Sequence, residues 1–283
     1  RDAVVINNSE LSSETDGTGR AGNVTVATGQ FTLQAGGEIT TATNAAGGGG
    51  NISVGATRGI DLLDAASSLQ ATTGIRAVAL TATQAGAAGT VRLTTSGLLN
   101  IQGATVSVSS GATGGNAGDV VIQAQAATLS QGGQVISNTA GAGQAGSLNW
   151  AIADGLTLQD PGTRLSASTG AGSTGGGGSI NVSAHQMHLG TGAEIVAATA
   201  GSGRAGSVNV VLGDRLTVQG NGTRMSANTE PGSTGAGGSL NLAANRLFLT
   251  SGAEISASTA GSGGAGSVTV KTNQAELSRG GRI

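Results

Sequence analysis

Apolar and polar residues alternate in short runs along the whole chain. In one stretch the runs cover 240–242 (Leu-Asn-Leu), 247–249 (Leu-Phe-Leu) and 255–257 (Ile-Ser-Ala). Alternation with period two is typical of a β-strand that buries one face. Glycine-rich clusters such as 260–266 separate the runs, and no window has the 3.6-residue period of an amphipathic helix. The pattern predicts an all-β chain of short strands joined by turns.

The group of three runs recurs as a unit that opens with a glycine, a small polar residue and alternating apolar residues. The opening glycines are Gly22, Gly50, Gly89, Gly118, Gly146, Gly178, Gly206, Gly238 and Gly266. They are 28 to 32 residues apart, except for one interval of 39. We interpret that interval as a unit with about seven extra residues near 74–80. Three strands and three turns of this length correspond to one rung of a β-solenoid.

Alignment of the units places apolar residues in three inward columns. The first is Val24, Ile52, Val91, Val120, Leu148, Ile180, Val208, Leu240 and Val268. The second is Leu33, Leu62, Ile101, Leu129, Leu158, Leu189, Val218, Leu249 and Leu277. The third is Ile39, Leu69, Val106, Val135, Leu165, Ile195, Met225 and Ile255. We therefore predict about nine three-stranded parallel rungs in a single domain over residues 1–283, forming a rod roughly 43 Å long at ~4.8 Å per rung.

Composition agrees with a narrow stack and disfavours a globule. Of 283 residues 53 are glycine, whereas phenylalanine and tryptophan together contribute three and tyrosine none. Apolar residues make up 37% and the net charge is −2, which disfavours both disorder and an electrostatically bound nucleic acid or anionic membrane. Without cysteine there is neither a disulfide nor a thiolate metal site. No apolar run reaches the ~20 residues of a membrane-spanning helix.

Two polar columns run beside the apolar ones. Charges alternate in the column Arg164, Glu194, Arg224, Glu254 and Arg282, directly before the third apolar column. Amides form the column Asn149, Asn181, Asn209 and Asn241. Parallel stacking makes the members of a column vertical neighbours, so opposite charges attract and amides hydrogen-bond. We interpret both as structural ladders and not as catalytic groups.

Few residues suggest other chemistry, and each has a structural interpretation. His185 and His188 fall on opposite faces of a strand with no cysteine or further histidine, so we expect no metal site. Trp150 lies in an inward position and is expected to fill the core; the alternative is a ring that stacks on a ligand. Asp61 and Asp64 lie beside the extra residues, where insertions on solenoids often form a binding face. This insertion is the one irregular part of the repeat, and we consider it a candidate functional site.

A row of Thr43, Thr169, Thr199, Thr229 and Thr259 also follows the stack. Flat threonine arrays on solenoids bind ice, but this row alternates unevenly with serine and asparagine, which argues against that role. Asp154 and Asp214 occupy one repeat position in non-adjacent rungs, which indicates a turn role.

The repeated phrase in 252–270, 192–210 and 36–54 resembles the repeats of filamentous-haemagglutinin-like exoproteins of the two-partner secretion type, common in cyanobacteria. This resemblance covers almost the whole chain as repeat, without the amino-terminal secretion domain of that family. It implies a right-handed parallel β-helix, export through an outer-membrane partner, and a place on the cell surface or outside the cell. Roles in adhesion, aggregation and fibre formation are implied, with no catalytic residue and no cofactor.

The leading hypothesis is a non-enzymatic structural rod of an extracellular filament or adhesin. Both ends fall inside a rung and lack a polar cap, so we expect a fragment of a longer rod or a subunit that stacks end to end. Matrix or surface polysaccharide is a further possible partner. The alternative is a carbohydrate-active β-helix lyase or hydrolase, which would gather three or more carboxylates in a groove. A ligand-binding module at 74–80 is the third possibility.

Overall fold

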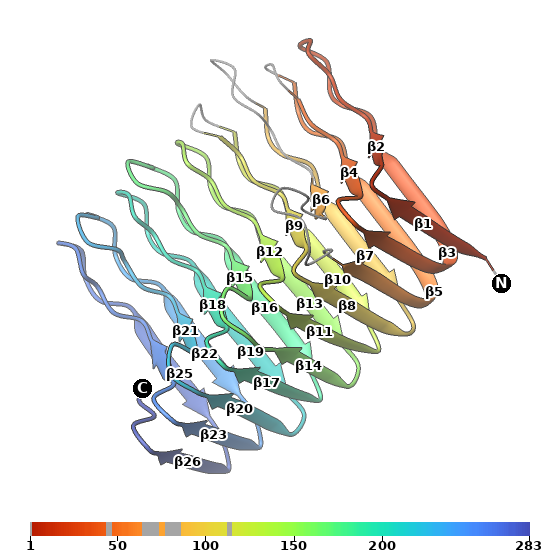
Figure 1. The fold of residues 1–283 in the computed structure, drawn as a ribbon. Helices are drawn as coiled ribbons and strands as arrows, with labels where there is room; N and C mark the ends of the chain where they lie inside the picture. The colour runs from red at the N-terminus through yellow and green to blue at the C-terminus, as the bar shows by residue number, and fades with distance from the viewer. Residues whose placement is uncertain (1, 44–46, 64–73, 77–85, 112–114) are drawn as a thin grey trace.

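The computed structural model describes residues 2–43, 47–63, 74–76, 86–111 and 115–283, and for 74–76 the backbone alone. These residues form strands and turns with no helix, wound into a parallel β-solenoid of about nine turns. The rungs stack along one axis and the two termini lie at opposite ends of the stack (Figure 1). The predicted all-β solenoid is confirmed.

Each rung contributes strands to two sheets. The first runs form β3 (Val24–Gln34), β5 (Ile52–Leu63), β7 (Val91–Thr95), β10 (Val120–Ala124), β13 (Leu148–Ile152), β16 (Ser179–Ala184), β19 (Ser207–Leu212), β22 (Ser239–Ala243) and β25 (Ser267–Lys271). The second runs form β1 (Ala3–Asn7), β8 (Leu98–Gln102), β11 (Ala126–Ser130), β14 (Gly155–Leu158), β17 (Gln186–Gly190), β20 (Arg215–Gln219), β23 (Arg246–Thr250) and β26 (Gln274–Ser278). Both sets belong to one 17-stranded sheet, because β3 and β5 pass through both runs without a break.

The third runs form a separate nine-stranded sheet. Its strands are β2 (Glu10–Ser12), β4 (Glu38–Thr40), β6 (Gly74–Arg76), β9 (Thr105–Ser107), β12 (Gln134–Ile136), β15 (Arg164–Ser166), β18 (Glu194–Val196), β21 (Arg224–Ser226) and β24 (Glu254–Ser256). All strand pairs in both sheets are parallel and join each rung to the next. The core lies between the two sheets.

The first two predicted apolar columns are confirmed by the register of the strands. Leu148 pairs with Ile180, and Ile180 pairs with Val208, as the alignment of the units required. Interior members of both columns, such as Ile180 and Leu189, are fully buried. Trp150 is 2% exposed and belongs to the same core, so its predicted place inside the stack is correct.

One member of the third column was predicted wrongly. In the structure Ile75 takes the place between Ile39 and Val106, and the prediction of Leu69 there is wrong. The step from Leu62 to Ile75 is seven residues longer than the step from Leu33 to Ile39. The extra residues therefore precede β6 in the chain and do not start at Gly74. Residues 64–73 and 77–85, which include Asp64 and most of the predicted insertion, lie outside the described residues.

In several rungs a tight corner joins the second and third strands. Ser251 and Gly252 have φ values of 58° and 79°, and Thr191 and Gly192 have 52° and 82°. Two consecutive positive φ angles are those of a type I′ turn, in which glycine at the second position avoids a steric penalty. This corner explains the recurring polar-glycine pair in the sequence.

A second glycine-rich feature is the segment between each third strand and the next first strand, which we call the glycine arm; one example is 167–178. The arms project together on one side of the rod (Figure 1). At the base of several arms the outgoing and returning chains bond to each other, for example Gly206 N to the Ala197 carbonyl at 2.9 Å. A Cβ on Gly206 would overlap the carbonyl oxygen of Gly178 in the preceding rung. Glycine is needed here because the backbones of adjacent rungs are in close contact. At the corners it is needed for its positive φ angle.

Candidate functional site

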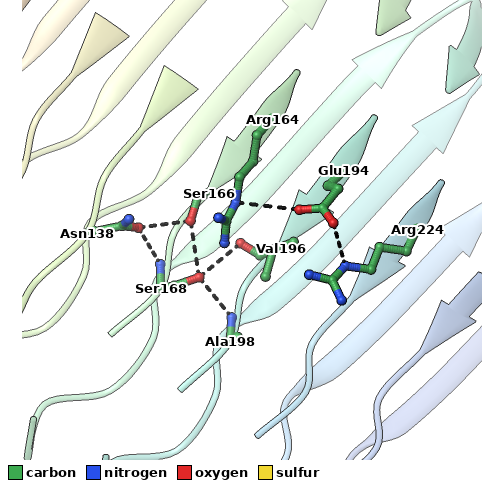
Figure 2. A network of polar contacts seen from close by, with 8 residues as sticks. All are labelled: Asn138, Arg164, Ser166, Ser168, Glu194, Val196, Ala198 and Arg224. Atoms are coloured by element: carbon green, nitrogen blue, oxygen red, sulfur yellow. Dashed lines mark hydrogen bonds and ion pairs between the residues drawn. The ribbon is translucent and has the colours of Figure 1, made fainter. Parts of the chain in front are cut away.

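The alternating charges of the third strands lie in one vertical column. Arg164 pairs with Glu194, Glu194 with Arg224, Arg224 with Glu254, and Glu254 with Arg282 through an isolated bridge. The ion pairs along this column are unequal. Arg224 Nε lies 2.9 Å from Glu194 Oε1, whereas Arg164 Nε lies 4.0 Å from Glu194 Oε2 (Figure 2). Glu194 is therefore engaged mainly by Arg224.

A second close ion pair, Glu254 with Arg282, ends the column at its carboxyl-terminal side. Arg282 Nε donates to Glu254 Oε2 at 3.1 Å, and Arg282 Nη2 reaches the same oxygen. This hydrogen bonding lowers the pKa of the Glu254 carboxyl below its ordinary value, against the effect of partial burial. Arg282 is well exposed, so this pair contributes little to stability.

The predicted amide column is a chain of hydrogen bonds on the face of the larger sheet. Asn181 Nδ2 donates to Asn149 Oδ1 at 2.9 Å, Asn209 to Asn181 at 2.9 Å, and Asn241 to Asn209 at 2.8 Å. Every link points toward the preceding rung, so the same hydrogen bond repeats along the stack. These bonds support the register of adjacent rungs.

Most of the threonine row is buried, and Thr259 near the carboxyl-terminal end is partly exposed. Thr139, Thr169, Thr199 and Thr229 pair from rung to rung at the start of the glycine arms, and each is at most 5% exposed. Thr169 Oγ1 and Thr199 Oγ1 are 2.7 Å apart and share a hydrogen bond. An ice surface cannot contact these four hydroxyls, because the residues are buried in the stack.

Beside this row, a polar network joins the third strands to the arms (Figure 2). Asn138 Oδ1 accepts hydrogen bonds from Ser166 Oγ at 3.0 Å and from Ser168 N at 2.8 Å. Ser168 Oγ in turn accepts from Ala198 N at 3.1 Å. The network crosses three rungs and holds the bend where the chain leaves the sheet.

The same bend contains a groove of about 410 Å³. Polar side chains of Ser110, Asn138, Arg164 and Glu230 line it, while Gly170 contributes only backbone. Ser110 Oγ and Arg164 Nε are buried and have no hydrogen-bond partner among the described residues. The groove is therefore lined by hydroxyl, amide and guanidinium side chains and by one carboxylate.

A second charged cluster was missed by the sequence interpretation. Arg246 binds both carboxylate oxygens of Asp214, with Nη2 at 2.8 Å and 2.6 Å and Nε at 3.0 Å. This bond lowers the pKa of Asp214 and raises that of Arg246. Asp214 lies in the predicted bend, between β19 and β20, and its carbonyl accepts from Arg246 N of the next rung. The sequence did contain a signal for this ion pair. Asp214-Arg215 and Asn245-Arg246 occupy the same position in successive units, which places Arg246 one rung from Asp214.

The other proposed positions show no convergent chemistry. His188 is half-buried in β17, and burial lowers its pKa. Asp61 accepts a hydrogen bond from Gln30 Nε2 at 2.9 Å across adjacent rungs. No set of three or more His, Asp or Glu side chains suited to a metal ion occurs within the described part of the chain. The described residues also contain no helix long and apolar enough to span a membrane.

Comparison with known proteins identifies no relative. No family model, no curated protein and no solved structure matches the chain.

Proposed function

We propose that the chain is a rod segment of an extracellular filament or cell-surface adhesin, of the filamentous-haemagglutinin-like type. The observation that carries this proposal is the unbroken register: each described rung pairs in parallel with the next from β1 to β26. A solenoid of this kind distributes its stability over nearest-neighbour interfaces and extends in one dimension. Such a molecule acts mechanically, as a stiff spacer.

The polar columns support the same role. Amide, hydroxyl and charged columns all connect one rung to the next, and none of them needs a partner molecule to be satisfied along most of its length. The net charge of −2 leaves the outer surface weakly charged. We propose self-association or continuation of the same rod as its principal contact, at the surface of the cell or outside it.

The alternative is a carbohydrate-active enzyme, which needs carboxylates gathered in a groove. The groove of about 410 Å³ contains one carboxylate, Glu230. This arrangement favours a non-enzymatic rod. Incubation of the chain with soluble acidic and neutral polysaccharides, followed by measurement of new reducing ends and of unsaturated products, tests the alternative directly.

Electron microscopy of the intact source material tests the proposed function. We expect thin filaments with a repeat near 4.8 Å along the axis, the spacing of stacked rungs. Antibodies raised against the chain should label these filaments on unpermeabilised cells. Discrete globular particles, or labelling that requires opened cells, would refute the proposal.

A further inference from the structure

A smaller groove lies on the outer face of the second strands, away from the bend described above. It measures about 250 Å³ and covers three consecutive rungs, those of β14, β17 and β20. Side chains of Thr157, Gln186, His188, Arg215 and Thr217 line it, and none of its lining residues is acidic. The groove therefore offers hydrogen-bonding groups and a positive charge to a ligand.

The positive charge belongs to Arg215, which lies beside the Asp214–Arg246 ion pair. Arg215 and Arg246 are vertical neighbours, and Arg246 occupies both carboxylate oxygens of Asp214. Asp214 acts on Arg215 only through a longer-range attraction. The Nη groups of Arg215 make no hydrogen bond or ion pair within the described part of the chain and, unlike its Nε, they are not buried. Arg215 can therefore receive an anion from solvent through its Nη groups.

The polar groups nearest to Arg215 are close enough to contact one small ligand. Met187 pairs with Leu216, which places Gln186 beside Arg215 on the preceding rung, about 4.8 Å away. Thr217 lies two residues along β20 on the same face as Arg215, about 7 Å away. Gln186 is exposed and Thr217 is half-buried. One sugar residue can reach all three side chains, because they occupy only two adjacent rungs.

Two features keep the space in front of these groups open. Gly155 precedes Gln186 in the same column and contributes no side chain. The imidazole of His188 lies over Gly190, where a Cβ would meet its Nε2 at 2.7 Å, so the ring turns away from the column of Arg215. Burial lowers the pKa of His188, so this ring is neutral at pH 7 and Arg215 supplies the one positive charge of the lining.

We propose that this groove binds a uronate, a sugar residue with a single carboxylate. The two carboxylate oxygens match the paired N–H donors of the Arg215 guanidinium. The Gln186 amide and the Thr217 hydroxyl bond the ring hydroxyls, which both donate and accept. A phosphate monoester brings a charge close to −2, which one arginine compensates only in part. This inference rests on the groove residues and stands independently of the proposed filament.

The test is a titration of the ¹⁵N-labelled full chain with galacturonate, followed through its amide chemical shifts at pH 7 and low salt. We expect saturable shifts at Gln186, Arg215 and Thr217. Neutral galactose should bind at least about tenfold more weakly, the loss expected for one charge-assisted hydrogen bond. Galactose 6-phosphate should also bind more weakly than galacturonate, because its second charge has no partner in the groove.

Two arginine variants separate the groove from a general effect of charge. Arg215→Gln should weaken galacturonate binding by about tenfold or more, the same loss as for the neutral sugar. Arg92→Gln is the matched control, because Arg92 is an exposed arginine on the outer face of β7 in the same sheet. It removes the same charge at a distance of several rungs and should retain the wild-type affinity.

A third variant leaves Arg215 intact and narrows the groove. A Cβ on Gly155 meets Gln186 at ordinary contact distances of 3.8 Å and 3.9 Å, and valine is favoured in strands. Gly155→Val should remove the saturable shifts, while the unfolding midpoint does not fall below the wild-type value. Absence of saturable shifts in the wild type, equal affinity for galactose, tighter binding of the phosphate, or equal losses in Arg215→Gln and Arg92→Gln would overturn the proposal.

Discussion

The glycine column at the base of the arms gives the sharpest test of how this rod is held together. Ser207 N donates to the Gly178 carbonyl at 3.1 Å, and Gly206 N donates to Ala197 at 2.9 Å. To receive the Ser207 bond, the Gly178 oxygen must lie directly against the Cα of Gly206. Gly206→Ala adds a methyl group that overlaps this oxygen.

Backbone cannot move aside as a flexible side chain does, so the substitution must separate two rungs locally. The two hydrogen bonds contribute about 1 kcal/mol each, and overpacking costs about 1–3 kcal/mol. We therefore expect Gly206→Ala to lower the free energy of unfolding by about 3–5 kcal/mol. Replacement of glycine by alanine stabilises a protein where the backbone and the available space accept alanine. A loss of stability in Gly206→Ala would therefore indicate the close contact between rungs.

Guanidinium unfolding followed by circular dichroism measures the loss, and amide exchange of Ser207 locates it. Gly264→Ala is the matched control, because a Cβ at Gly264 meets nothing within 4 Å. Its stability should stay within about 0.5 kcal/mol of the wild type. Equal unfolding midpoints for the two variants would refute the close backbone contact between rungs.

Three further predictions concern the core and the polar columns. Ile195→Ala removes a fully buried side chain and should cost about 2–5 kcal/mol, whereas Val211→Ala, at an exposed position, should be nearly neutral in the same unfolding assay. Asn181→Ala breaks two links of the amide column and should cost about 1–2 kcal/mol, roughly twice the loss for Asn241→Ala, which breaks one; equal losses would contradict the ladder. The folded-state pKa of Glu254 is lowered, so its contribution is present above the unfolded value of 4.5 and is lost as the pH falls through the folded pKa. Glu254→Gln should therefore reduce the acid sensitivity of the unfolding midpoint, and an unchanged pH profile would contradict this assignment.

Much of the rod could be predicted from the order of residues. The period-two runs and the spacing of their glycines predicted the strands, the stacking and the partners of Ile180 and Leu189. Register is strongly specified here, because a shift by one residue would turn every inward side chain outward. The wrong position, Leu69 in place of Ile75, falls in the one unit whose length departs from the repeat, where no neighbouring unit supplies an alignment.

The sequence by itself determined the solenoid, its columns and which charged residues are vertical neighbours, since all three follow from a repeat length near 30 residues. Only the tertiary structure decided which members of a column contact each other and which are buried. It placed Glu194 close to Arg224 and left Arg164 at a distance, and it buried Thr139, Thr169, Thr199 and Thr229. The physical reason is that a repeat fixes the axial spacing of residues, whereas side-chain rotamers and the path of the arms fix burial and contact.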